Sequence, residues 1–340
     1  MSLPAELRER LTLPAICAPM FSVTGPALVR EACKAGVIGA LPRSNADSFE
    51  TFAGWLTAIN QDLQHTAERQ PWRRIAPMAV NLRMTLSATD FDRHLRLCVD
   101  QGVQIVITAG GDPADAVQRV HDHGMSLYHD VTSLRFAEKA IAAGADGLTC
   151  IGAGGGGHSG TLGHLVLVPK VRAMFGGTVV MAGSVSTGAA IRAGEVLGAD
   201  LAYLGTRFIA THESEADPEY KQLIVNNGAT DLMYTRDIAG VPANWMVESM
   251  RRQGLDPRDL PKPKGPGRSY DHLPRHVRPW KTLWSAGQGI DLIDDVPTVA
   301  ELVARLRTEY LAACAVPDMS ASARLTADEL SALSVQAVEP

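Results

Sequence analysis

The chain alternates short apolar runs with longer amphipathic segments between residue 15 and about residue 208. The short runs have the length of β-strands and are apolar throughout, without the alternation of a strand that faces water on one side. Such strands are typical of a parallel sheet covered on both faces, because each side chain then meets either a packed interior or an outer helix. Eight runs fit this description: AICAPM from Ala15, VIGALP from Val37, IAPMAVNL from Ile75, IVITAG from Ile105, SLYHDV from Ser126, GLTCIG from Gly147, VVMAGS from Val179 and LAYLGTRF from Leu201.

The segments between the runs have the spacing of amphipathic helices, and several end in a glycine that can cap a helix C-terminus. The endings AGV, QGV, AGAD and LGAD place a glycine one to three residues before the next strand, as in short helix-to-strand turns. Eight β-α units in this order predict a closed (β/α)₈ TIM barrel. An open doubly wound sheet is the alternative, because units are easily miscounted in one sequence. Predicted helices begin at Pro26, Asp90, Ala114, Ser133 and Thr187.

The pattern changes after Phe208. A helical stretch from about Ser214 to Asn227 leads into PRDLPKPKGPGRSYDHLPRHVRPW, which we expect to be a loop-rich excursion that packs over the barrel mouth. A stretch from Thr298 predicts a helix that returns to the outer ring. The sequence thus divides into a barrel (1–228 and 298–316), a lid that shapes the substrate site (229–297) and an Ala- and Ser-rich tail (317–340), whose final turns we expect to be mobile.

Composition narrows the class of protein. With 46% hydrophobic and 20% charged residues, the 340-residue chain can bury one large core. A net charge of -5 and a pI near 6.1 argue against a nucleic-acid partner. No apolar run approaches the roughly 20 residues of a membrane span, and the amino terminus lacks a signal-peptide pattern, so we expect a cytoplasmic protein without a membrane partner. A homodimer is an assembly that the sequence leaves open.

The cysteines and the metal motifs add two expectations. The five cysteines are widely spaced, odd in number and form no CxxC pair, and we interpret them as reduced, buried thiols: Cys17, Cys33, Cys98, Cys150 and Cys314. No HExxH motif and no carboxylate cluster occurs at the predicted strand ends, so no metal is predicted.

The ends of the seventh and eighth strands predict a phosphate site. In barrels of this kind the active site lies at the carboxyl ends of the strands, and the loops after the last two strands commonly hold a phosphate. These loops contain Gly183, Ser184, Gly205 and Thr206. Small residues let backbone amides point at phosphate oxygens, and the two hydroxyls add donors. Two ordinary strand-to-helix turns are the alternative.

The sixth strand runs into GAGGGGHSGTLGH, a glycine-rich loop with His158 in its middle. Because it follows the carboxyl end of a strand, we interpret it as a binding loop that lets backbone approach a ligand closely, rather than as a flexible hinge. Weaker candidates end the first and third strands: Ala18, Met20 and Asn81. His129 and His164 also lie near the predicted mouth, but single histidines at loop edges are usually structural.

Together these pieces resemble the nitronate monooxygenase family, formerly called 2-nitropropane dioxygenases, whose members are FMN-dependent (β/α)₈ barrels. The resemblance covers about residues 14–227 and is partly shared with FMN-dependent enoyl-acyl-carrier-protein reductases and NADH:quinone reductases. Its motifs stand in matching order: APM at Ala18, NL at Asn81, TSLR at Thr132, GAD followed by the GGHSG loop with His158, AGS at Ala182 and LGADLAYLGTRFIAT from Leu197.

The resemblance implies a role for each matching residue. Met20 and Asn81 would contact the flavin ring, the Gly183 and Gly205 loops would hold the phosphate, and His158 would either abstract the α-proton of a nitroalkane or position an ionised nitronate. The reaction would convert nitronates, with O₂, to carbonyl compounds and nitrite. The ring would be lined by Gly155, Gly156 and Gly157.

Two departures bear on the flavin environment. Ala153 and Gly154 stand where many relatives have an acidic residue, and Asp130 stands after the fifth strand where some have a lysine. Two other functions stay open: an FMN-dependent NAD(P)H:quinone or enoyl-thioester reductase, and a barrel that binds a phosphorylated ligand without catalysis.

Overall fold

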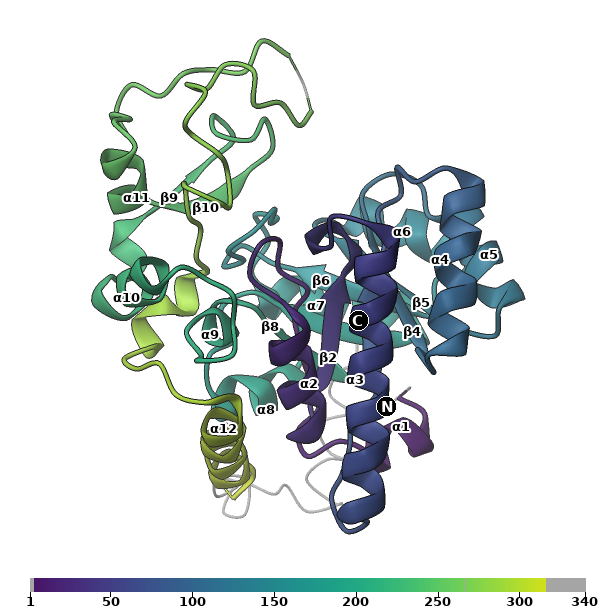
Figure 1. The fold of residues 1–340 in the computed structure, drawn as a ribbon. Coiled ribbons are helices and arrows are strands. Elements are labelled where there is room, and N and C mark those ends of the chain that lie inside the picture. Colours follow the sequence, from purple (N-terminus) through teal and green to yellow (C-terminus); the bar gives the residue numbers. More distant parts are fainter. Residues whose placement is uncertain (1–2, 266, 316–340) are drawn as a thin grey trace, which may run out of the picture.

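The structure is a computed structural model that describes residues 3–265 and 267–315 (Figure 1). Eight parallel strands follow one another around a closed barrel, and the last pairs with the first. In this closing pair Ile16 lies opposite Tyr203 and Cys17 opposite Leu204. The predicted barrel is therefore confirmed over the open sheet. The strands are β1 (Ala15–Cys17), β2 (Ile38–Pro42), β3 (Met78–Asn81), β4 (Ile105–Ala109), β5 (Ser126–Val131), β6 (Gly147–Ile151), β7 (Thr178–Ala182) and β8 (Leu201–Leu204).

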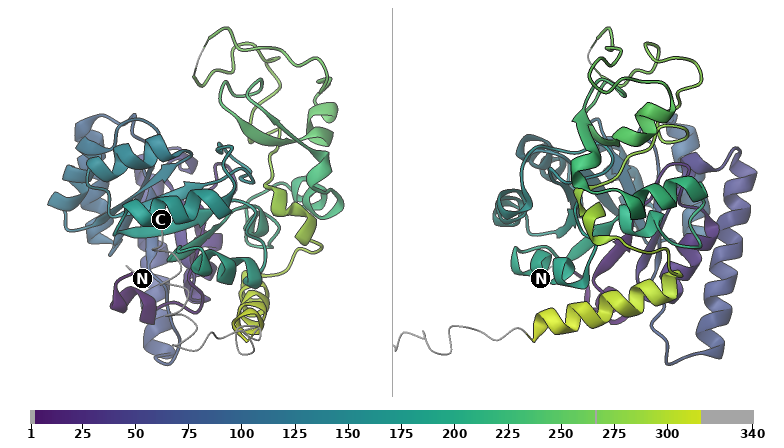
Figure 2. Two further views of the ribbon diagram at one scale, coloured as in Figure 1. Left: turned by 180° about the vertical axis from the view of Figure 1, so that it is seen from behind. Right: turned by 90° about the vertical axis from the view of Figure 1, so that its left-hand side faces the viewer.

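Helices cover the outside of the barrel, and the yellow helix α12 returns along its lower side to pack against α8 and α2 (Figure 2). Serine or threonine caps begin several of them; the Thr187 side chain, for example, accepts a hydrogen bond from the amide of Ala190 at the start of α8. The helices of the ring are α2 (Pro26–Lys34), α3 (Phe49–Arg69), α4 (Ala88–Asp100), α5 (Ala114–Asp122), α6 (Leu134–Ala142), α7 (His164–Met174), α8 (Gly188–Val196) and α12 (Val299–Cys314).

Alternate residues of the strands belong to two separate hydrophobic clusters, which explains why the strands are apolar throughout. Cys17, Leu41 and Val80 pack outward against the helices. Ile16, Ile38, Ala79 and other interior residues fill the barrel, together with leucines from around α1 (Ala5–Glu9). The interior is thus a packed core whose ligand-binding end must be the open carboxyl end of the strands.

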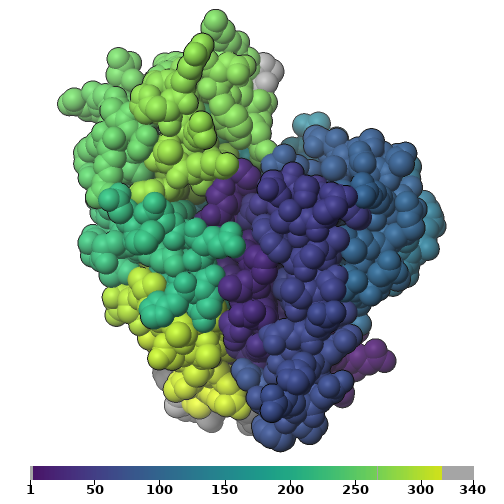
Figure 3. Space-filling model, viewed as in Figure 1, coloured from purple at the N-terminus to yellow at the C-terminus, as the bar shows by residue number. Residues whose placement is uncertain are grey.

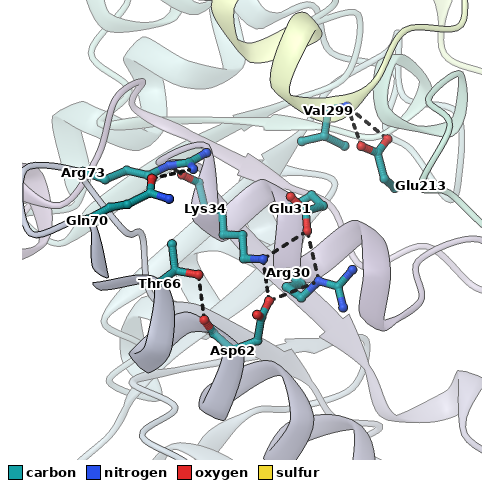
Figure 4. Close-up of polar contacts among 9 residues, drawn as sticks. All are labelled: Arg30, Glu31, Lys34, Asp62, Thr66, Gln70, Arg73, Glu213 and Val299. Carbon is teal, nitrogen blue, oxygen red and sulfur yellow. Dashed lines mark hydrogen bonds and ion pairs between the residues drawn. The ribbon is translucent and has the colours of Figure 1, made fainter. Parts of the chain in front are cut away.

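Polar contacts fix the first and last parts of the ring (Figure 4). Lys34 and Arg30 of α2 both form ion pairs with Asp62 of α3, which ties the long helix α3 to its neighbour. In the same region, the carboxylate of Glu213 accepts hydrogen bonds of 3.0 Å from the amide of Val299. This contact joins the segment after β8 to the first residue of α12.

Residues after β8 build a separate lobe that rises beside the barrel mouth (Figure 1). In the space-filling view it stands across a notch from the part of the barrel that carries α4 (Figure 3). We expected loops here, but the lobe contains an antiparallel hairpin, in which Asn244 lies opposite Tyr234. The elements are α9 (Thr206–Ile209), α10 (Pro218–Asn226), η2 (Ala229–Asp231), β9 (Leu232–Thr235), β10 (Ala243–Met246), α11 (Val247–Arg252) and η3 (Gln288–Leu292); a further short turn, η1 (Arg43–Asn45), follows β2.

Three sequence-based expectations can be compared with these elements. The helix expected from about Ser214 begins at Pro218. The expectation of buried thiols holds for four cysteines but is wrong for Cys314, which is exposed near the end of α12. Within the described residues, no helix combines the length and apolarity required to cross a bilayer. The predicted tail, 317–340, lies outside the described residues.

Candidate functional site

The glycine-rich loop after β6 is packed against three other segments at the barrel mouth. A β-carbon on Gly154 would fall 1.6 Å from Ser184 Oγ, and one on Gly156 would fall 2.7 Å from the amide nitrogen of Gly287. A β-carbon on Gly160 would lie 2.1 Å from the carbonyl oxygen of Thr132. Gly156 and Gly160 are therefore required for close backbone approach, which favours a built loop over a flexible hinge.

The turns after β7 and β8 lie at the same place. Gly183 has a φ of 109° and Ser184 a φ of 57°, a left-handed conformation that is uncommon for a residue with a side chain. Gly205 directly precedes α9, and Thr206 is the first residue of that helix. The first amides of a helix have no partner within the helix, so this turn can present donors to an anion.

We call the turns after β7 and β8, with Gly183, Ser184, Gly205 and Thr206, the phosphate cradle. The segment at Gly287 and Gln288 supports this cradle and the glycine loop, and the sequence analysis did not identify it. The amide of Gly287 donates a hydrogen bond of 2.8 Å to Thr206 Oγ1, and the amide of Gln288 donates one of 3.0 Å to the carbonyl of Gly154. The two glycines in the sequence SAGQG, Gly287 and Gly289, were the available indication. They lie about 80 residues beyond the turn that they support, so spacing alone could not connect them.

Ala18 and Met20, at the end of β1, lie on the other side of the turn after β8. A β-carbon on Gly205 would lie 3.5 Å from Met20 Sδ and 3.9 Å from the Ala18 side chain. Asn81 ends β3 and donates a hydrogen bond of 3.2 Å from Nδ2 to the carbonyl of Ile107. Gly157, in contrast, is exposed, and a β-carbon there would meet open space.

Asp130 lies inside the barrel, near the carboxyl end of β5. It is two residues beyond Tyr128, which belongs to the interior cluster, and alternate residues of a strand face the same side. Its Oδ1 atom is buried without a hydrogen-bond partner in the described part of the chain. Burial raises the pKa of Asp130 to about 7, and the nearby Thr149 hydroxyl partly offsets this effect. Burial also raises the pKa of the partly buried Tyr203 on β8, and the Asp130 charge adds to this rise.

His158 projects from the glycine loop toward the lobe. Its ring meets Trp280 edge to face, with the ring centroids 5.1 Å apart. An NH₂ group of Arg268 lies 3.0 Å from His158 Nδ1, while Nε2 is buried and has no hydrogen-bond partner among the residues described. Burial first, and then the charge of Arg268, lower the pKa of His158 to about 4. The imidazole is therefore neutral near pH 7.

The lobe is attached directly to this loop. Buried Asn244 of β10 donates a hydrogen bond of 2.7 Å from Nδ2 to the carbonyl of Gly155. The backbones of His158 and Ala243 form an antiparallel bridge. Behind them, Trp245 is fully buried against Trp280, with the ring centroids 4.8 Å apart. The Trp280 ring therefore covers one side of His158, and Trp245 supports Trp280 from behind.

The other two histidines near the mouth have structural contacts. His129 is buried on the helix-facing side of β5. Its Nδ1 atom lies 2.8 Å from the hydroxyl oxygen of Thr108. His164 begins α7, and its Nε2 atom donates to the carbonyl of Ala182 at 2.7 Å. Both rings hold neighbouring elements of the barrel together, as expected.

A cavity of about 460 Å³ lies at the opposite end of the barrel, away from the glycine loops. It is lined by Arg10, Arg73 and Arg74 among others. These guanidinium groups donate to the carbonyls of Ile75, Lys34 and Leu11, so they serve the backbone of this end of the barrel. Because ligands of such barrels bind at the carboxyl ends of the strands, the mouth is the candidate site and this cavity is not.

Comparison with known proteins identifies the family of the chain. The chain is 29% identical over 338 residues to a nitronate monooxygenase of Paraburkholderia phytofirmans, covering 87% of this chain and 92% of the relative. It is 27% identical over 229 residues to an indene-carboxyl-CoA dehydrogenase of Rhodococcus jostii, covering 67% and 61%. Its fold matches the crystal structure of nitroalkane oxidase from Streptomyces ansochromogenes with a TM-score of 0.69, at 24% identity and over 92% and 100% of the two chains. The family profile described as nitronate monooxygenase matches residues 7–309. The chain therefore belongs to the nitronate monooxygenase family and is an oxidoreductase of the flavin type.

Proposed function

We propose that this protein uses FMN and molecular oxygen to oxidise alkyl nitronates to carbonyl compounds and nitrite. The C=N bond of the nitronate is replaced by C=O, nitrite leaves with the electron pair of the broken bond, and each O₂ supplies the oxygen atoms for two substrate molecules. The observation that carries the proposal is the position of His158, whose buried Nε2 has no partner among the described residues and lies on a glycine loop at the barrel mouth.

The residues at the mouth fit FMN. The cradle of Gly183, Ser184, Gly205 and Thr206 offers amides and hydroxyls to a phosphate, and Gly287 supports it through Thr206. Deeper in the barrel, the buried Oδ1 of Asp130 lacks a partner in the described chain, and a polar ring system would supply one. Lining residues for that ring would be Ala18, Met20, Asn81, Gly155, Gly156 and Gly157. When bound, the flavin supplies the redox chemistry, accepting electrons from the substrate and passing them to oxygen.

The chain's own residues would orient the substrate. His158 Nε2 can donate a hydrogen bond to a nitronate oxygen, and the Trp280 ring fixes the imidazole plane. The hairpin of β9 and β10 belongs to the segment that we propose to shape the substrate site, residues 229–297. We also propose the cytosol as its compartment, in keeping with the four buried free thiols.

The direct test is an anaerobic flavin spectrum of the purified protein, with propyl-2-nitronate added to one sample and NADH to another. We expect the nitronate alone to bleach the flavin or produce its semiquinone, and oxygen then to restore the spectrum with release of nitrite. Rapid bleaching by NADH with no response to nitronate would overturn the proposal in favour of the reductase. A colourless protein that cannot be reconstituted with FMN would favour the non-catalytic barrel.

The reductase has one structural observation in its favour. Burial raises the pKa of Tyr270, and the charges of Arg268 and Arg83 both lower it, so two guanidinium groups lie within electrostatic range of this side chain. Such a pair could bind the phosphates of NAD(P)H or of a thioester carrier. The NADH arm of the same experiment distinguishes this function from nitronate oxidation.

A further inference from the structure

The hydrogen bond between Arg268 and His158 determines which ring nitrogen carries the proton. A guanidinium group has only donors, so Nδ1 of His158 must accept in the contact of 3.0 Å. In the neutral imidazole the single N–H is then on Nε2. A base needs a free nitrogen lone pair, and the lone pair of this ring is already used by Arg268. The histidine is therefore arranged as a hydrogen-bond donor.

The surroundings of Nε2 agree with this assignment. The atom is buried and has no partner in the described part of the chain, which is costly for an N–H group unless a ligand accepts from it. A nitronate carries its negative charge on two oxygens and is a strong acceptor, whereas a neutral nitro group is a weak one. The ring is enclosed by Trp280 and by the β10 backbone at Ala243. Arg268 is the charged group whose field acts on it.

Charge around the ring also favours an anion. Arg268 is exposed, and Arg83 lies close enough that both lower the pKa of Tyr270, which burial raises. A positive potential at the mouth attracts an anionic substrate and opposes formation of an imidazolium. A base that takes a proton from carbon would have to form that imidazolium beside Arg268.

We propose that Arg268 is a positioning residue that fixes the proton on Nε2 of His158 and so makes this enzyme selective for preformed nitronate anions over neutral nitroalkanes. The inference rests on the proposed function, because it names which protonation state of that substrate is used. Burial and the Arg268 charge lower the pKa of His158 to about 4, so they also keep the imidazole neutral, as this assignment requires.

The test compares three variants with the wild type. Arg268→Met keeps an unbranched side chain but removes every donor, and Arg268→Lys restores a donor and a charge. Arg258→Met is the matched control, because Arg258 lies in the same lobe, pairs with Asp256 and has a side chain that is 90% exposed. Oxygen uptake is measured with propyl-2-nitronate and with freshly dissolved neutral 2-nitropropane.

We expect the wild type, Arg268→Lys and Arg258→Met to prefer the nitronate strongly in kcat/KM. Arg268→Met should raise the nitroalkane-to-nitronate ratio of kcat/KM at least about tenfold. Without Arg268 the proton can move to Nδ1, and Nε2 then has a free lone pair and can act as a base, whose contribution is typically 100-fold or more. An unchanged ratio in Arg268→Met would overturn the proposal. So would a wild type that oxidises both compounds equally well.

A second readout does not depend on turnover. Nitrogen NMR of ¹⁵N-histidine-labelled holoenzyme, assigned with His158→Asn, should show the His158 proton on Nε2 in the wild type. In Arg268→Met the pKa of this ring should rise, because the positive charge beside it is removed. A wild-type proton on Nδ1 would refute the assignment. If no protein oxidises either compound, the proposed function fails together with the selectivity, while the NMR result still reports whether Arg268 fixes the tautomer.

Discussion

The side chain of Asn244 holds the carbonyl of Gly155 at 2.7 Å, and this bond joins the lobe to the glycine loop on which His158 stands. Asn244 is 2% exposed and lies on β10, one residue beyond the backbone bridge between Ala243 and His158. The position of His158 thus depends on a strand about 85 residues away in sequence. A side chain on a loop becomes well placed only through such second contacts.

Replacing Asn244 by alanine should loosen the loop without removing any group that reaches the substrate. The buried Gly155 carbonyl would lose its partner, a cost of about 1–3 kcal/mol. We expect Asn244→Ala to weaken FMN binding and to lower kcat/KM on nitronate about tenfold, measured by flavin fluorescence and oxygen uptake. The matched control is Asn226→Ala, at an exposed asparagine on α10. Equal activity in both variants would show that the lobe does not position the loop.

Thr206 offers a specific test of the phosphate cradle. Thr206→Val keeps the shape of the side chain but removes the oxygen that accepts from the Gly287 amide at 2.8 Å. We expect FMN affinity to fall about ten- to 100-fold, the effect of losing a hydrogen bond to a charged group. Riboflavin, which has no phosphate, should bind both proteins alike, and Thr206→Ser should resemble the wild type. Equal losses for FMN and riboflavin would place the phosphate elsewhere.

Asp130 predicts a pH dependence of flavin binding. Its pKa is raised to about 7 by burial, so the neutral acid predominates below pH 7 and the buried carboxylate forms above it. If the neutral acid faces the flavin, FMN affinity should fall as the pH rises from 6 to 8.5. Asp130→Asn imitates the neutral acid and should bind FMN with little dependence on pH. FMN affinity is measured for both proteins by fluorescence titration across this pH range. If the affinity of Asp130→Asn falls as steeply with pH as that of the wild type, a group other than Asp130 causes the pH dependence.

The barrel could be predicted from the sequence because its strands are marked locally. Each of the eight apolar runs overlaps an observed strand, and all but the run from Val179 contain the whole strand, since burial on both faces imposes the same composition on each. Helix α7 was harder to recognise, because Pro169 lies inside it and its exposed side carries Leu165. Helix α3 was not singled out, although its buried face, with Phe52, Leu56 and Ile59, has helical spacing.

The candidate site was only partly accessible to sequence reasoning. Residues at strand ends, such as Ser184 and Thr206, could be proposed because the fold places every strand end at one mouth. Gly287 and Arg268 could not, because they belong to the lobe, whose path over the mouth depends on long-range packing of residues such as Trp245. The hairpin of the lobe was missed for the same reason: the nearby prolines and glycines suggested loops, and pairing of β9 with β10 is a tertiary contact.

His129 predicts how stability changes in acid. Its pKa is lowered to about 4 by burial, whereas an unfolded histidine titrates near 6.5. Between these values the unfolded chain binds a proton that the folded chain excludes, so acidification from pH 6.5 to 4 destabilises the fold, by about 3 kcal/mol for this residue.

His129→Gln cannot take up that proton and can still accept from the Thr108 hydroxyl, so its unfolding free energy should fall less over this range. Urea unfolding at several pH values measures the difference, with His65→Gln, at an exposed position on α3, as the control. His158 contributes in the same direction in all three proteins and cancels in the comparison. The same acid dependence in His129→Gln and the wild type would mean that His129 becomes protonated in the folded barrel.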